Sequence, residues 1–215
     1  MPKETILVFG SHSDDFVIGA GGTIARYARE GKRVISIVFS YGEKSHPWIK
    51  EEVTRSFRLK EAKRAAKVLG CQLFILNFRE GKFWDWEDYQ KNGNEEKLLA
   101  ILNKEKPVKI FTHSGEDPHG DHHEAFKITL DLLAKMNSPP PVYSYSIWNP
   151  VSRKTSYPCL FVDISHTFAQ KKVALHCFPS QWISVYTLIG GIYFKALSQG
   201  LRIGVKYGEK FFKIK

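Results

Sequence analysis

Short apolar runs alternate with longer helical segments along most of this chain. The strand-like runs cover residues 5–10, 33–40, 72–78, 108–113, 142–148 and 159–164, and the helical patterns cover 17–30, 51–69, 94–105, 122–136 and 167–177. Alternation of this kind predicts parallel strands joined by right-handed crossover helices. We therefore expect an α/β fold with three layers, a mostly parallel sheet and a strand order near 3-2-1-4-5.

Length and composition fit one folded domain over residues 1–215, with 43% hydrophobic and 13% aromatic residues. The tail 183–215 is aromatic and glycine-rich, which predicts a small C-terminal cap or a surface for oligomer contact. No run approaches the roughly 18 apolar residues of a membrane span, so no integral membrane segment is expected. The N-terminus leads directly into the first strand, with no room for a signal peptide, which predicts a cytoplasmic protein.

The formal net charge of +10 raises the question of an acidic partner. The basic residues are spread along the chain rather than gathered in an arm or interleaved with aromatic side chains. That distribution predicts no nucleic-acid partner and favours solvated faces. An anionic substrate or a loose attraction to an acidic surface stays open.

Two clusters of acidic and histidine residues follow two of the predicted strands. His12-Ser13-Asp14-Asp15 follows the run 5–10, and the second cluster, Asp117-Pro118-His119-Gly120-Asp121-His122-His123, follows the run 108–113. The order 3-2-1-4-5 makes those two strands neighbours, and the carboxyl ends of neighbouring parallel strands face one crevice. We therefore expect the two clusters to converge on one site.

The residue types in the clusters suit a divalent metal. Two histidines and one carboxylate, His12, Asp15 and His122, form a ligand set with open positions for water and substrate. Asp14 would then be free to act as general base on a metal-bound water. His119 could donate to a developing oxyanion or protonate a leaving amine, and Asp121 could orient a histidine from behind.

Two helical segments carry further predictions. Gly19-Ala20-Gly21-Gly22 lacks the spacing and position of a dinucleotide-binding loop, so we interpret it as close packing of a helix near the site. In the segment 51–69, an apolar stripe of Val53, Phe57, Ala65, Val68 and Leu69 is expected to face the core.

At these residues the chain resembles the PIG-L/LmbE-like family of zinc-dependent N-acetylglucosamine deacetylases. Members of that family carry His-Pro-Asp-Asp-Glu after the first strand and His-Pro-Asp-His after the fourth. In this chain Ser13 and Phe16 replace the Pro and Glu of the first motif, and Gly120 replaces the Pro of the second. Further similar elements follow in order: Gly21-Gly22-Thr23, Ser40-Tyr41-Gly42-Glu43, Arg58-x-x-Glu61, Ser180-Gln181 (after Phe178, where the family has a histidine) and Glu209-x-Phe211.

The resemblance implies a Rossmann-like domain with His12, Asp15 and His122 as zinc ligands, Asp14 as base and His119 as acid or oxyanion donor. It also implies weaker roles for Arg58 and Glu43, toward substrate hydroxyls or in loop structure. The loops 44–50 and 81–93 are candidates to wall a sugar-sized pocket, and the flat indole of Trp84 suits a sugar face. Family members often form oligomers, so a homo-oligomer is expected.

The predicted function is hydrolysis of the acetamide of an N-acetylglucosamine-type sugar, with Zn²⁺ as cofactor and Fe²⁺ or Co²⁺ as possible replacements. Two alternatives stay open. The Asp121-His122-His123 run is also typical of phosphoesterases, which would make the substrate a phosphoester. The altered motifs also allow a non-catalytic protein that binds zinc or a sugar.

Overall fold

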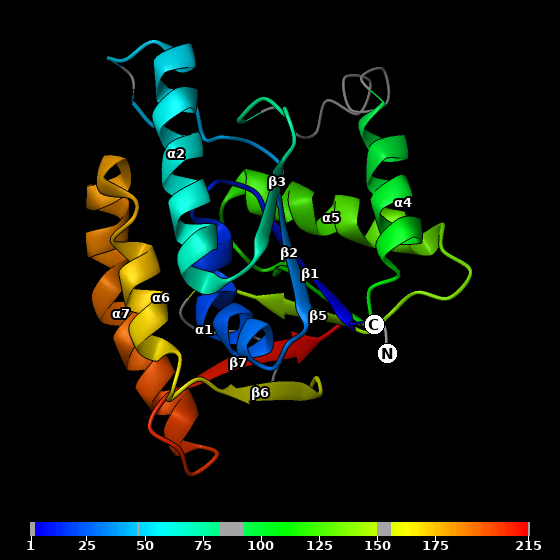
Figure 1. Cartoon of the computed structure of the whole chain (residues 1–215), viewed down its shortest axis with the longest axis vertical. Coiled ribbons are helices and arrows are strands. Elements are labelled where there is room, and N and C mark those ends of the chain that lie inside the picture. Colours follow the sequence, from blue (N-terminus) through cyan, green and yellow to red (C-terminus); the bar gives the residue numbers. More distant parts are fainter. Residues whose placement is uncertain (1–2, 47, 82–92, 150–155, 215) are drawn as a thin grey trace.

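The computed structural model describes residues 3–46, 48–81, 93–149 and 156–214 (Figure 1). The strands within those ranges are β1 (Thr5–Gly10), β2 (Arg33–Val38), β3 (Gln72–Ile75), β4 (Lys109–His113), β5 (Val142–Tyr145), β6 (Cys159–Asp163) and β7 (Gly208–Lys213). The helices there are α1 (Asp15–Arg29), α2 (Glu51–Leu69), α4 (Asn94–Glu105), α5 (Gly120–Ala134), α6 (Phe168–Leu175) and α7 (Trp182–Leu201), with a short 3-10 turn, η1 (Pro179–Gln181).

One sheet runs through the domain in the order β3-β2-β1-β4-β5-β7-β6. The first five strands are parallel and follow the predicted order 3-2-1-4-5, which is confirmed. Strands β7 and β6 extend the sheet by antiparallel pairing. The order places β1 beside β4, so the residues that follow these two strands lie at the same edge of the sheet.

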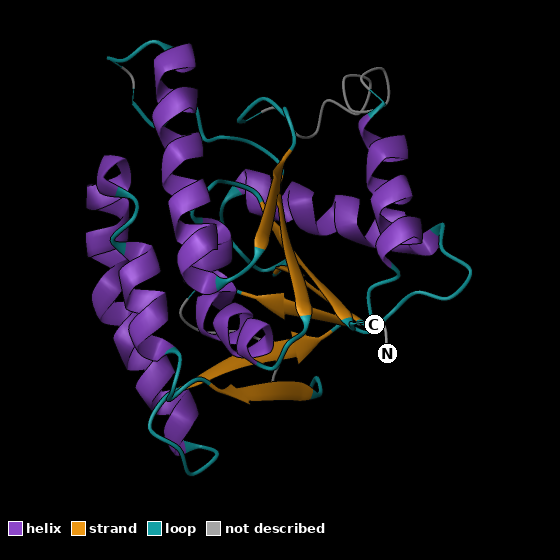
Figure 2. Ribbon diagram, viewed as in Figure 1, coloured by secondary structure: helices purple, strands orange, loops and turns teal. Residues whose placement is uncertain are grey.

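Helices cover both faces of this sheet, as Figure 2 shows. One hydrophobic core lies under α1, α2, α6 and α7, and it receives Ile6 and Val8 of β1. A second core lies under α4 and α5 and receives Leu7 and Phe9. Because side chains alternate across a strand, the continuous apolar run of β1 serves both cores. The fold is thus the expected three-layer α/β domain.

The tail 183–215, for which we expected a small cap or a surface for oligomer contact, contributes a helix and a strand to the main fold. Helix α7 packs along β7, and β7 lies inside the sheet between β5 and β6. In β7, Glu209 and Phe211 face the interior under α1, while the lysines between and after them are more exposed. Among the described residues, no helix is both long and apolar enough to cross a membrane.

Helix α2 buries only the C-terminal part of the stripe predicted for it. Val53 is 51% exposed, whereas the polar residues Thr54, Arg58 and Glu61 are buried. The prediction is confirmed at the C-terminal end of α2, where Ala65 and Leu69 join the core. The N-terminal half of α2 contacts polar groups instead: Arg58 contacts Asp14, and Glu61 accepts hydrogen bonds from Ser180. A hydrophobic pattern could not reveal a helix end that faces polar partners.

Helix α1 is interrupted at Ala20, whose φ of −140° lies outside the helical range. A buried ion pair satisfies the backbone groups that the interruption frees. The Lys171 ammonium donates to the carbonyl of Ile18 and to the Glu209 carboxylate, which in turn accepts hydrogen bonds from the backbone N–H groups of Gly22 and Thr23. The adjacent glycines allow close approach, because a Cβ at Gly19 would overlap the ring of Tyr145 and one at Gly22 would overlap Ile164. The predicted close packing of this glycine segment is confirmed.

We expect the Lys171–Glu209 pair to be important for stability because both side chains are buried. Glu209→Gln leaves the ammonium without its carboxylate and should lower the free energy of unfolding by about 3 kcal/mol, measured by urea denaturation. The double variant Lys171→Met/Glu209→Gln should lose less than the sum of its single variants. The control is Glu30→Gln at the C-cap of α1. It breaks an exposed pair with Arg26 and should lower the free energy of unfolding by at most about 1 kcal/mol. Equal losses for Glu209→Gln and Glu30→Gln would contradict this role.

Candidate metal centre at the ends of β1 and β4

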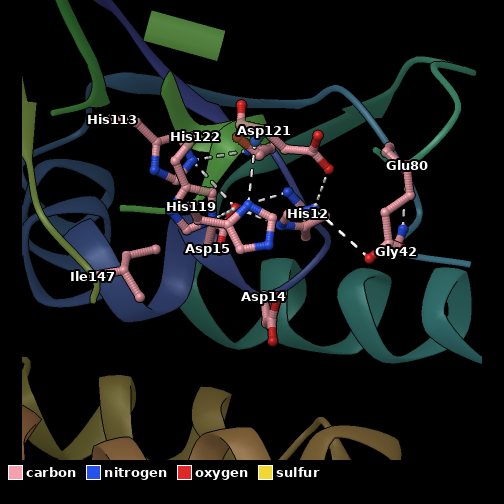
Figure 3. A network of polar contacts seen from close by, with 12 residues as sticks. His12, Asp14, Asp15, Gly42, Glu80, His113, His119, Asp121, His122 and Ile147 are labelled. Atoms are coloured by element: carbon pink, nitrogen blue, oxygen red, sulfur yellow. Dashed lines mark hydrogen bonds and ion pairs between the residues drawn. The ribbon is translucent and has the colours of Figure 1, made fainter. Parts of the chain in front are cut away.

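The two clusters predicted to converge do meet, as Figure 3 shows for His12, Asp15 and His122. His12 follows β1, Asp15 begins α1, and His122 lies in the first turn of α5. All three side chains are buried, and a donor atom from each lies within 4.8 Å of the others. The parallel pairing of β1 with β4 produces this meeting, because it brings the starts of α1 and α5 to one edge of the sheet.

The Asp15 carboxylate lies at the centre of the cluster. Its Oδ2 accepts a hydrogen bond of 2.7 Å from the backbone N–H of His12 and lies 3.4 Å from Nε2 of His122 and 3.5 Å from Nδ1 of His12. Burial alone would raise the pKa of Asp15, but His122, His113 and His12 outweigh it and hold the pKa well below its usual value. Asp15 is therefore an anion in the protein interior, as a metal ligand must be.

A second carboxylate backs each of the two histidines. Asp121 Oδ2 lies 3.1 Å from Nε2 of His12, and Asp117 Oδ1 lies 3.0 Å from Nδ1 of His122. Each ring thus turns one nitrogen toward Asp15 and the other toward an acid. Histidine ligands of metals have this arrangement, because the outer carboxylate fixes the orientation of the ring and strengthens its basicity. Asp121 therefore lies where the sequence prediction required it.

The pKa values of His12 and Asp117 show that the carboxylates of this cluster attract positive charge. Burial would lower the pKa of His12, but its contacts with Asp121 and Asp15 raise the pKa to about 10. Burial would raise the pKa of Asp117, but His122 and the backbone N–H groups of Ile147 and His119 lower it to about 2. A metal bound by His12 would displace the proton that this ring otherwise holds.

Three overlapping sets of donors among the described residues could hold a metal, and the set His12–Asp15–His122 fits best. The sets His12–His119–Asp121 and His113–Asp117–His122 would use as ligands the carboxylates that now orient the rings. The chosen set combines two imidazoles with one carboxylate, as catalytic zinc sites often do. The residues present therefore fit the metal that the sequence predicted.

His119 lies at the mouth of this cluster, more exposed than the other histidines named here. Its ring stacks on His122 with centroids 4.6 Å apart and meets His12 edge-on at 5.0 Å. Burial and then the neighbouring positive charges of His12 and His122 lower its pKa, and its Nδ1 accepts a hydrogen bond from the backbone N–H of Asp121. The neutral ring therefore carries its proton on Nε2, as a hydrogen-bond donor to substrate requires.

Asp14 does not join the histidine cluster. Figure 3 shows its side chain directed away from the rings. Its Oδ1 lies 3.3 Å from Nη2 of Arg58, and Nε of Arg58 donates to the carbonyl of Tyr41. The Asp14 side chain makes no capping hydrogen bond to α1, although acids in this position commonly do. Arg58 thus fixes the orientation of the candidate base, while its own Nη1 has no hydrogen-bond partner among the described residues.

Glu43 lies in a contact network of its own, apart from the candidate metal ligands. The buried Glu43 accepts hydrogen bonds from Ser40, Arg55 and the backbone of Glu80, which is a loop-structure role. Burial would raise the pKa of Glu43, but these contacts lower it. Trp84 and most of the loop 81–93 lie outside the described residues.

Sequence reasoning missed three contributors to the site. His113 is the last residue of β4, and its Nε2 lies 3.2 Å from Asp15 Oδ2 and accepts a hydrogen bond from the backbone N–H of Ser11. Burial and then the charge of His122 lower the pKa of His113 to about 4, so the ring is neutral. Asp117 stood in the recognised cluster but was given no role. Glu80 approaches His12 to 4.0 Å from a loop that carries no sequence signal.

Comparison with known proteins places this site among related enzymes. The family model described as PIG-L, GlcNAc-PI de-N-acetylase, matches residues 7–133. A 4-oxalmesaconate hydratase of Pseudomonas putida is 28% identical, with 84% of this chain and 75% of that protein covered. A 1D-myo-inositol 2-acetamido-2-deoxy-alpha-D-glucopyranoside deacetylase of Actinosynnema mirum is also 28% identical, over 62% of this chain and 56% of its own length.

A solved structure shares the whole fold. The N,N'-diacetylchitobiose deacetylase of Pyrococcus horikoshii superposes with a TM-score of 0.79 over 98% of this chain and 84% of its own, at 24% identity. The family match covers more than half of this chain and includes both strand-end clusters. The chain therefore belongs to the PIG-L family of GlcNAc-PI de-N-acetylases and related enzymes.

Proposed function

We propose that this protein hydrolyses the acetamide of an N-acetylglucosamine-type amino sugar, releasing acetate and the free amine, with a divalent metal bound by His12, Asp15 and His122. The observation that carries the proposal is the convergence of these three side chains, with Asp121 and Asp117 behind the two rings. The relative from Actinosynnema mirum, whose name specifies such a deacetylation, supports the choice of reaction.

A zinc ion bound there would supply a Lewis acid that polarises the amide carbonyl and makes a water more acidic. Asp14 would take the proton of the attacking water once its side chain turns from its contact with Arg58 toward the rings. His119, neutral and protonated on Nε2, donates a hydrogen bond to the developing oxyanion. A proton then returns to the leaving nitrogen, so that the amino sugar departs as the free amine.

The direct test is acetate release from N-acetylglucosamine, diacetylchitobiose and N-acetylglucosaminyl-inositol. We expect release from at least one compound, its loss after chelation and its recovery when zinc is restored. A protein that keeps its metal but releases no acetate from any of them would contradict the proposal. Cleavage of a phosphodiester in parallel assays would identify the phosphoesterase alternative, and binding without turnover would identify the non-catalytic one.

A second candidate is the addition of water to an unsaturated carboxylic acid, the reaction that the name of the Pseudomonas putida relative specifies. Two observations favour it. Phe16, which stands where the deacetylase motif has Glu, is fully buried in the core and offers no carboxylate. Nη1 of Arg58, which has no hydrogen-bond partner among the described residues, could bind a substrate carboxylate. Hydration of 4-oxalmesaconate without acetate release from the sugars would establish this second candidate.

The role of Asp14 as base predicts that a substitution there lowers turnover without affecting metal binding. Asp14→Asn keeps the shape of the side chain but removes its basicity, so turnover should fall about 10²- to 10⁴-fold while metal content stays at the wild-type level. Asp131→Asn, the same change at an exposed position of α5, should leave both unchanged. Turnover should be measured by acetate release and metal by elemental analysis. An active Asp14→Asn protein with full metal content would remove Asp14 from the role of base.

The role of Asp117 predicts an effect on the metal itself. Asp117→Asn removes the carboxylate behind His122, and we expect the metal affinity to fall about 10- to 100-fold, measured by competition with a chelator. Asp131→Asn is again the matched control. An unchanged affinity for Asp117→Asn would mean that His122 does not depend on this contact, or is not a ligand.

We also propose that the protein self-associates through α7. The exposed face of this helix carries Ile183, Tyr186, Phe194 and Leu197, with Gly190 between them. These side chains are placed symmetrically about Gly190, at four and seven residues on either side. An antiparallel second copy of α7 would therefore set Tyr186 against Phe194 and Ile183 against Leu197, which is the self-complementary pattern of a two-fold interface. A Cβ at Gly190 would meet nothing within the subunit, so the helix backbone is accessible to a close partner.

Placing a charge on this face should separate the copies. Phe194 is 73% exposed, so Phe194→Asp should leave the fold intact and reduce the molar mass in solution, measured by light scattering, to that of one chain. Val173→Asp, at an exposed apolar position of α6, should leave the mass unchanged. A wild-type protein with the mass of one chain would contradict self-association, and an oligomer insensitive to Phe194→Asp would place the interface elsewhere.

A further inference from the structure

A cavity of about 380 Å³ lies apart from the histidine cluster, between the C-terminal half of α7 and the strands β5 and β7. Ile192, Lys195 and Ala196 of α7 form one wall, and Ser144 and Phe212 belong to the strands opposite. Its volume falls within the range of small-molecule sites in proteins, roughly 300–1,000 Å³. None of the residues assigned above to metal binding or to the reaction lines it.

The charged residues that line this cavity are mostly basic. Among the described residues they are one acid, Glu209, and four basic side chains: Lys171, Lys195, Arg202 and Lys210. The Glu209 carboxylate is already shared between Lys171 and two backbone N–H groups of α1. Among the described residues, no carboxylate in the lining therefore remains for Lys195 and Arg202, while the Lys210 ammonium lies 4.2 Å from the centroid of the Phe212 ring.

Lys195 is the clearest case of a basic side chain in this lining without a carboxylate partner among the described residues. It is partly buried, and within the described part of the chain its Nζ donates over 3.4 Å to the carbonyls of Ser146 and Asn149. Burial and then repulsion from Lys171 lower the pKa of Lys195. A negatively charged group in the cavity would relieve both effects, since a buried ammonium is stabilised by an anion at close range.

The Arg202 guanidinium, at the C-terminal end of α7, can bind an oxyanion in bidentate fashion.

This cavity is connected with the metal site through a short segment of backbone. The carbonyls of Ser146 and Asn149 contact Lys195, while the backbone N–H groups of Ile147 and Trp148, between them, donate to Asp117 at 3.0 and 3.2 Å. Asp117 in turn contacts His122. A ligand that draws Lys195 away from the two carbonyls would therefore act on the segment that holds Asp117.

We propose that this cavity binds a small organic anion with at least two negative charges, either a phosphorylated sugar or a polycarboxylate, through Lys195 and Arg202. The shared chemistry is a cluster of oxyanions of the size of one sugar ring. None of the candidate metal ligands lines the cavity, so the proposal does not depend on which reaction the metal centre performs. The net charge of +10 adds a general attraction for such ligands.

Calorimetric titration of the purified chain with glucose 6-phosphate and with citrate tests the proposal and distinguishes the two sources, with glucose as the uncharged probe. We expect one of the two anions to bind and glucose not to bind. Lys195→Met/Arg202→Met should weaken that binding at least about tenfold, which corresponds to about 1.4 kcal/mol. Lys67→Met/Lys104→Met removes the same charge from exposed positions of α2 and α4 and should leave the affinity unchanged.

Two further measurements make the result decisive. Binding should persist after the metal is removed by a chelator, because an anion held only by the metal would be lost. Arg202→Met alone, at an exposed position, should also weaken binding, which covers the case in which the first double variant fails to fold. No binding of either anion up to about 10 mM, or equal weakening in both double variants, would overturn the proposal.

Discussion

The parallel pairing of β1 with β4 is the constraint on which the site depends. The two strands are distant in sequence, and only their adjacency brings the starts of α1 and α5 together. Asp15 then stands between His12 and His122, and the acids that follow β4 back both rings. The cost of burying so many titratable groups is met by pairing each acid with an imidazole or with backbone N–H groups, and a metal ion would complete that compensation.

Different contacts hold the two candidate ligand histidines and the candidate base, Asp14. The two candidate ligand histidines are held by carboxylates that themselves accept backbone hydrogen bonds, as Asp117 does from Ile147 and Asp121 does from Gly81. Asp14 is held differently, by the guanidinium of Arg58 from α2. The candidate metal ligands and the candidate base thus belong to separate contact networks. That separation is why substitutions at Asp117 and Asp14 should affect different quantities, affinity in one case and turnover in the other.

Much of the architecture could be read from the sequence, because it follows from local periodicity. The bounds of α2 and α4, and the order of the first five strands, match the pattern of apolar residues. Contacts between polar residues far apart in the chain left no such pattern. The pairing of Lys171 with Glu209, the burial of Arg58 and the approach of Glu80 to His12 depend on tertiary packing. His113 was missed for a related reason, since a single histidine at the end of a strand has no distinguishing spacing.

The most direct test of the metal centre is a crystal structure of the purified protein with zinc, using diffraction data collected on both sides of the zinc absorption edge. We expect one anomalous peak per chain, bonded to a nitrogen of His12, an oxygen of Asp15 and Nε2 of His122, with Asp121 and Asp117 still in contact with the outer nitrogens. A peak bonded instead to His113 and Asp117, or no peak in a protein that hydrolyses its substrate, would contradict the proposed centre.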